Sequence, residues 1–244
     1  AERPWATPGA SVDLALVLDI RRGWHTYWSN PGDSGEPLRL AWDLPEGVRA
    51  GPIRWPVPSL IRVGPLANYG YSGQAAYLVA LQVPPDWSPG QPLPVRVRTD
   101  WLVCEEHCIP EGGDLDLTLS VVQTPRADAA ADLVAAEIVA ARAALPREAI
   151  AGARLSRSGT DIRLRIPAAH LADQPDSVWF FSDQWGLIDH AAPQPWRLRS
   201  GELELGLTSG PVSQAGLTGL LVVSSHGVTR GYPLAAVAGP DGGG

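Results

Sequence analysis

Residues 95–110 read VRVRTDWLVCEEHCIP and join a strand pattern to the two cysteines of the chain. The first half of this segment alternates apolar and polar residues, which is typical of a half-buried strand. Cys104 and Cys108 follow, with three polar residues between them. If one strand ends at Val103 and the next begins at Ile109, the cysteines face each other across a hairpin-like loop, at a separation that allows a disulfide.

Apolar alternation predicts strands throughout the rest of the chain, and 26 glycines and 24 prolines supply the turns between them. The expected strands are residues 11–20, 24–28, 38–42, 76–83, 95–101, 115–121, 162–166, 178–181, 203–207, 217–224 and 232–237. Asn30-Pro31-Gly32-Asp33 is expected to form a turn. The pattern predicts an all-β protein of two tandem β-sandwich domains.

One helix is expected between the two domains. Thr124 is a suitable N-cap, Pro125 suits the first helical position, and Pro146 ends the segment. Its apolar residues fall at helical spacing: Val134, Ile138, Ala141 and Leu145. We therefore expect a first sandwich over 1–124, a helical linker over 125–147 and a second sandwich over 148–244.

Composition excludes several classes of function. The net charge is -7 and no basic block occurs, which argues against a nucleic-acid partner. No run of 18 apolar residues is present, so the sequence contains no predicted membrane span. At 244 residues the chain can bury a core without help from a disulfide, and a bridge closing so short a loop contributes only ~2 kcal/mol.

The spacing of the cysteines leaves three interpretations open: a redox-active pair, a structural bridge and a metal site. Glu105 and Glu106 disfavour a thiolate by charge repulsion, while a protonated His107 favours one. A copper- or zinc-binding module would use both cysteines with His107 and His25. Structural zinc sites usually carry two short cysteine pairs, and this chain has one.

Two aromatic segments also allow more than one interpretation. Residues 24–28, which include His25 and Tyr27, are most simply a strand whose rings pack in a core. Tyr69 and Tyr71 lie in a segment flanked by glycines. They suit either a lid over a site or a loop packed against the protein.

Four motifs in order resemble the N-terminal periplasmic domain of the DsbD family, over about residues 10–122. They are residues 23–35 (GWHTYWSNPGDSG), Trp55-Pro56, Tyr69-Gly70-Tyr71 and the segment from Trp101 to Pro110. The resemblance is greatest to the ScsB-type branch, which is linked to suppression of copper sensitivity. It implies an immunoglobulin-like fold for the first domain and a second immunoglobulin-like domain after the helix.

The resemblance implies a protein-disulfide reductase without metal or organic cofactor. The domain would be the soluble periplasmic part of an inner-membrane protein and would receive electrons from the transmembrane and thioredoxin-like domains of that parent. It would pass them to an oxidised thioredoxin-fold substrate, such as an ScsC-like protein. Cys108 matches the attacking cysteine and Cys104 the resolving one.

The resemblance also gives the neighbouring residues a place around the redox pair. Tyr69 and Tyr71 lie where the family has a cap that shields the cysteines, and Trp101, His25 and Tyr27 are expected to form the rest of the housing. This sequence departs from the better-known DsbD branch in two respects. Its cysteines are closer together, and tyrosine replaces the phenylalanine around which the family cap is built.

Overall fold

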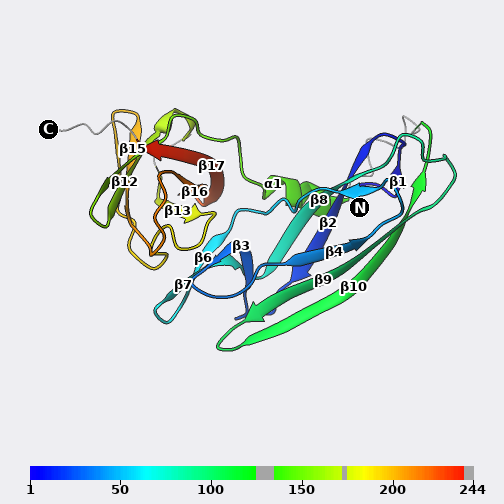
Figure 1. The fold of residues 1–244 in the computed structure, drawn as a ribbon, viewed down its shortest axis with the longest axis horizontal. Helices are drawn as coiled ribbons and strands as arrows, with labels where there is room; N and C mark the ends of the chain where they lie inside the picture. The colour runs from blue at the N-terminus through cyan, green and yellow to red at the C-terminus, as the bar shows by residue number, and fades with distance from the viewer. Residues whose placement is uncertain (125–134, 172–174, 239–244) are drawn as a thin grey trace. The chain divides into compact units, whose positions relative to one another are not determined.

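The structure is a computed structural model that describes residues 1–124, 135–171 and 175–238. Its regular structure is nearly all β, which confirms the predicted fold class (Figure 1). The chain divides into two compact units. Unit 1 comprises Ala1–Trp28, Glu36–Pro58 and Tyr71–Leu145, and unit 2 comprises Ser29–Gly35, Ser59–Gly70 and Pro146–Gly244.

Unit 1 contains two sheets that pack face to face as in a β-sandwich. The first has the order β1 (Trp5–Ala6), β10 (Cys108–Val121), β9 (Leu93–Cys104) and β4 (Arg39–Asp43), and the second the order β2 (Ser11–Asp19), β8 (Gln74–Gln82) and β5 (Arg49–Ala50). Alternate residues of both sheets face inward and form one buried cluster, in which Leu14 and Leu81 of the second sheet meet Val95 and Leu119 of the first. The predicted period-two pattern thus marks the core face.

A third sheet is formed by β3 (Thr26–Gly32), β7 (Leu66–Tyr71) and β6 (Ser59–Val63), in the order β3-β7-β6. The turn predicted at residues 30–33 was wrong in part, because strand β3 continues through Pro31 and ends at Gly32, whose φ is 82°. A proline can remain in a strand at the edge of a sheet, and β3 is an edge strand.

The helix α1 (Ala136–Ala143) is shorter than predicted and packs within unit 1. Ile138 and Ala141 are buried against Leu78 of β8, which confirms the predicted apolar face. Residue Thr124 is not helical, and the predicted first turns at 125–134 lie outside the described residues. The helix therefore belongs to the core of one unit, since its apolar stripe is buried there.

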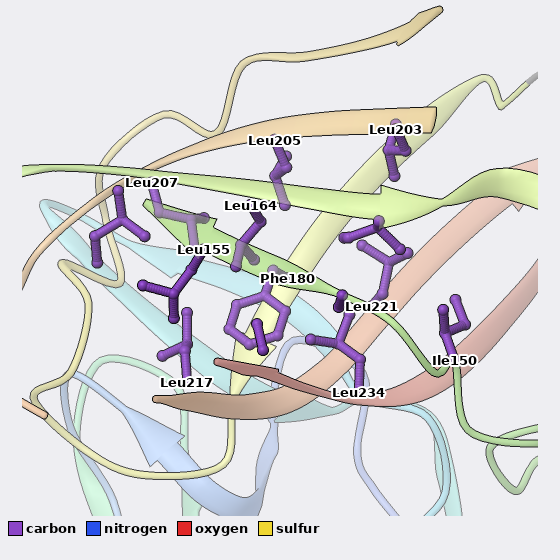
Figure 2. Close-up of a cluster of buried hydrophobic side chains, with 14 of the residues drawn as sticks. Ile150, Leu155, Leu164, Phe180, Leu203, Leu205, Leu207, Leu217, Leu221 and Leu234 are labelled. Atoms are coloured by element: carbon purple, nitrogen blue, oxygen red, sulfur yellow. The ribbon is translucent and has the colours of Figure 1, made fainter. Parts of the chain in front are cut away.

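The C-terminal part of unit 2, from Pro146 onward, is built from one seven-stranded sheet that packs on itself. Its order is β13 (Ser177–Ser182), β16 (Leu217–Ser225), β17 (Val228–Ala238), β11 (Arg154–Ser158), β12 (Asp161–Pro167), β15 (Glu202–Thr208) and β14 (Trp196–Arg199), with a short 3-10 helix η1 (Ala168–His170) after β12. Figure 2 shows Phe180 of β13 among leucines from both halves of this sheet, including Leu164 and Leu221. All these side chains are almost fully buried.

The observed units differ from the predicted boundaries at 124 and 147. Two segments of the N-terminal half, 29–35 and 59–70, cluster with unit 2 rather than with the strands that flank them in the sequence. Two side-chain contacts illustrate this grouping: Asn30 donates to the carbonyl of Ser182 at 2.8 Å, and the phenol of Tyr69 lies 2.8 Å from Nδ1 of His190. Alternation identifies strands but not their neighbours, so the sequence did not show this division.

Candidate redox site

The two cysteines close the hairpin formed by β9 and β10, as the sequence predicted. Cys104, the last residue of β9, lies directly opposite Cys108, the first residue of β10. Residues 105–107 form the connecting loop, in which the N–H of Glu105 donates to the carbonyl of His107 at 3.2 Å. The two sulfurs are bonded at 2.03 Å.

Backbone hydrogen bonds explain why these two side chains meet. Cys104 donates to and accepts from His25, at 2.9 Å in each direction. The N–H and C=O of one strand residue point to the same side, so those of Cys104 point away from β10. Cys104 and Cys108 are thus a non-hydrogen-bonded pair, whose backbones approach closely, and their Cα atoms are 4.1 Å apart.

The two cysteines differ sharply in accessibility. Cys104 is 3% exposed, because it lies between the backbones of His25 and Cys108. Cys108 begins β10, in the part of that strand whose outer side no described strand pairs, and it is exposed. Cys108 is therefore the more accessible of the two cysteines to a partner that approaches from solvent.

His25 and Tyr27 lie on the disulfide face of the sheet, two residues apart in sequence. The phenol of Tyr27 is 3.7 Å from Sγ of Cys108 and 3.2 Å from Nε2 of His25. Burial lowers the pKa of His25, so its imidazole is neutral at pH 7. A disulfide sulfur carries no proton, so in this state the phenol is the donor in any hydrogen bond to Cys108.

The charged residues of the loop are exposed to solvent. Glu105, Glu106 and His107 are all exposed, as expected for a hairpin tip. Gly23, with a φ of 91°, lies under the Glu105 side chain, since a Cβ added there would be 2.7 Å from its Oε1. A side chain at position 23 would meet the Glu105 carboxylate, so the glycine leaves room for it.

Trp101 is on the other face of the hairpin from the disulfide. Successive side chains of β9 lie on opposite faces, so Leu102 and Cys104 are on one face and Trp101 is on the other. Trp101 lines a cavity of about 250 Å³ together with Trp24, Val103 and Ile109. Ile109 is 45% exposed at this position. Trp101 therefore supports the hairpin from its inner face rather than contacting the sulfurs.

Tyr69 and Tyr71, predicted as a cap, are both buried in strand β7. The Tyr69 ring contacts Phe181 edge-to-face at 4.7 Å, and Tyr71 donates its hydroxyl to the carbonyl of Pro56 at 2.8 Å. Burial raises the pKa of both phenols well above their usual value. These contacts place both rings in the protein interior. Among the described residues, the tyrosine that contacts the disulfide is Tyr27. Flanking glycines do not distinguish a loop from a buried strand, so this difference could not be predicted from the sequence.

The residues considered for a metal site do not form one group. His107 is exposed in the loop, whereas Nε2 of His25 lies against Tyr27. Within residues 1–124, 135–171 and 175–238, no three or more His, Cys, Asp or Glu side chains gather in an arrangement that could hold a metal ion.

Comparison with protein families gives a match for the part of the chain that carries this site. Residues 2–120 match the family model described as "Thiol:disulfide interchange protein DsbD, N-terminal". This part of the chain belongs to the DsbD N-terminal domain family. The DsbD-type domain is accordingly a thiol:disulfide interchange domain, and its disulfide lies at the tip of the β9–β10 hairpin.

Solved structures extend the likeness to the second unit. The N-terminal periplasmic domain of ScsB from Proteus mirabilis matches with a TM-score of 0.63 and 18% identity, over 96% of this chain and 91% of that one. At this identity the match shows the fold, which is shared along nearly the whole chain. Comparison with curated protein sequences gave no match.

Two other solved structures have much lower similarity. An endo-fucoidan hydrolase of glycoside hydrolase family 107, MfFcnA9, has a TM-score of 0.23 and 8% identity, over 96% of this chain and 32% of that chain. A chimeric titin Z1Z2 has a TM-score of 0.21 and 11% identity, over 97% and 93%. Neither supports an argument about function. Among the described residues, no helix is long and apolar enough to cross a membrane.

Proposed function

We propose that this DsbD-type domain carries electrons in the periplasm as a protein-disulfide reductase. The transmembrane and thioredoxin-like domains of an inner-membrane parent protein would reduce it, and an oxidised thioredoxin-fold protein, such as an ScsC-like protein, would receive the electrons. The observation that carries the proposal is the asymmetric disulfide, which pairs an exposed Cys108 with a buried Cys104 at the tip of a hairpin. Exposed bridges are the labile and catalytic ones, because a partner sulfur must be able to reach one of the two cysteines.

The reaction proceeds in two exchanges. The thiolate of reduced Cys108 attacks one sulfur of the partner disulfide, forms a mixed disulfide and releases the other partner sulfur as a thiolate, which takes up a proton. Cys104 then loses its proton and attacks the sulfur of Cys108. This step forms the Cys104–Cys108 bridge and releases the second partner thiol, so that two electrons have passed to the partner.

Neighbouring side chains assist without a metal or organic cofactor. Tyr27 can donate its hydroxyl to the Cys108 thiolate, and neutral His25 can accept a hydrogen bond from the same phenol when the sulfur is bonded. Because Cys104 faces Cys108 across a short loop, the resolving attack needs no rearrangement of the strands. Copper linkage of the parent system is part of this proposal and rests on the resemblance to the ScsB branch.

Single-cysteine variants test the proposal. Cys104→Ala should form a lasting mixed disulfide with a purified thioredoxin-fold protein in its disulfide form, detected as a complex that dithiothreitol dissolves. The matched variant Cys108→Ala keeps one cysteine but should form little complex, since Cys104 is buried. Equal trapping by both variants would contradict the assigned roles. A reduction potential of the bridge below about -300 mV would make it an inert structural disulfide.

A further inference from the structure

Strand β10 leaves much of one sheet edge unpaired, starting at the exposed cysteine. β9 pairs with it along one side from Cys108 to Leu119. On the other side, β1 pairs only with Ser120 and Val121. Among the described residues, no strand pairs with this outer side over residues 108–119. Residues 108–116 are also exposed without interruption.

The register shows which backbone groups face outward along this edge. Cys108 is a non-hydrogen-bonded partner of Cys104, so its N–H and C=O point away from β9, and the same holds for every second residue after it. The far end of the strand agrees, because the N–H of Ser120 donates to the carbonyl of Pro4 in the segment leading into β1. The free edge therefore offers the N–H and C=O groups of Cys108, Gly112, Asp114, Asp116 and Thr118.

Pro110 occupies the remaining outward position and offers a carbonyl only. An interrupted row of donors is a known protection of edge strands against pairing with copies of themselves. At this site the interruption leaves donors on both sides of the proline. A partner held covalently at Cys108 needs few further hydrogen bonds, because the bond keeps its backbone at high effective concentration.

The charge along the edge is negative. Glu111, Asp114 and Asp116 are the charged residues of β10, and none of its residues is basic. The facing arginines of β9 form ion pairs elsewhere: Arg96 with Asp43, and Arg98 with Asp100. The acidic loop at residues 105–106 continues the same surface next to the disulfide.

We infer that a redox partner adds an extended, basic segment to the outer edge of β10 as its sulfur joins Cys108. This inference rests on the proposed exchange function and adds the chemistry of recognition to it. Main-chain hydrogen bonds to residues 112, 114 and 116 align the segment, and its lysine or arginine side chains meet the acidic groups of the strand. The partner's sequence matters less than its extended backbone and its charge.

Activated peptides test this with the full chain carrying Cys104→Ala. The probe is a short peptide in which lysine and valine alternate about a cysteine activated as the thionitrobenzoate disulfide. Its matched control carries N-methyl groups on the amides that would pair. The thiol of Cys108 should release thionitrobenzoate about tenfold faster from the first peptide, a ratio that corresponds to about 1.4 kcal/mol. A glutamate version should react more slowly at low salt, and this difference should vanish at high salt.

Hydrogen exchange on the adduct locates the contact. The amides of Gly112, Asp114 and Asp116 should become protected, whereas those of Gly113 and Leu115 already bond to β9 and should not change. Asp114→Pro should slow the peptide reaction about fivefold, and Asp114→Asn, which keeps the N–H, should retain most of the rate. Fast but equal rates with both peptides, together with unprotected edge amides, would overturn the docking inference and leave the exchange function intact. No release from any peptide would overturn the exchange function and this inference with it.

Discussion

Reducing the Cys104–Cys108 bridge should destabilise unit 1 only slightly. The cysteines are four residues apart, so the bridge removes little entropy from the unfolded chain, and the loop-closure relation gives ~2 kcal/mol. The hairpin has other support. Its pairing continues from the cysteines to Leu93 and Leu119, and those two residues are in the sandwich core at the opposite end of the strands. Reduction thus leaves the core packing in place.

Hydrogen exchange measures this cost in each unit separately. Amides of β8, which is buried in unit 1, should exchange about thirtyfold faster after reduction, because 1.36 kcal/mol is a factor of ten. Amides of β16 in unit 2 serve as the internal control and should not change. The variant with both cysteines replaced by alanine should resemble the reduced protein.

The opposite result would restore the structural interpretation of the bridge. If reduction exposes β8 to full exchange, or costs more than about 5 kcal/mol, the bridge is needed for folding and stabilises unit 1 by more than its short loop accounts for. A cost near the expected value favours a bridge that can open and close in each catalytic cycle without loss of the fold.

Four further outcomes are expected. Tyr69→Phe removes the buried hydrogen bond to His190 and should destabilise unit 2 by ~1–3 kcal/mol in urea denaturation, with unchanged exchange of β8 as control. Burial lowers the pKa of His190 below 6.5, so the unfolded chain binds a proton at this imidazole more tightly than the folded chain does. Unit 2 should therefore be most stable above about pH 6.5 and should lose stability as the pH falls through the folded-state pKa. A stability of unit 2 that does not change with pH would contradict this. Asp13→Asn breaks the ion pair with Arg142 of α1 and should lower the free energy of unfolding by ~1–2 kcal/mol, a modest value because the arginine is partly exposed to solvent. The amides of α1 should then exchange faster with solvent. Tyr27→Phe should slow the reaction of the single-cysteine variant with a small disulfide about fivefold, and an unchanged rate would remove the phenol from the mechanism.

The sequence alone determined the hairpin and many of the strands, but strands β6, β7, β11 and β14 were not predicted. Period-two alternation is local, and it predicted β2, β9 and β12 within a few residues of their observed bounds. The spacing of Cys104 and Cys108 is local too, so it predicted that they face each other. The family motifs then gave the chemistry of the pair.

Tertiary structure decided which groups surround the pair and which unit each strand joins. Exposure is a property of the assembled sheets, so only the fold distinguishes the buried Cys104 from the exposed Cys108. Tyr69, expected over the cysteines, belongs to unit 2 because its phenol and ring find partners that are more than a hundred residues away in sequence. No local pattern encodes such contacts, nor does it show that one edge of β10 remains free beside the reactive sulfur.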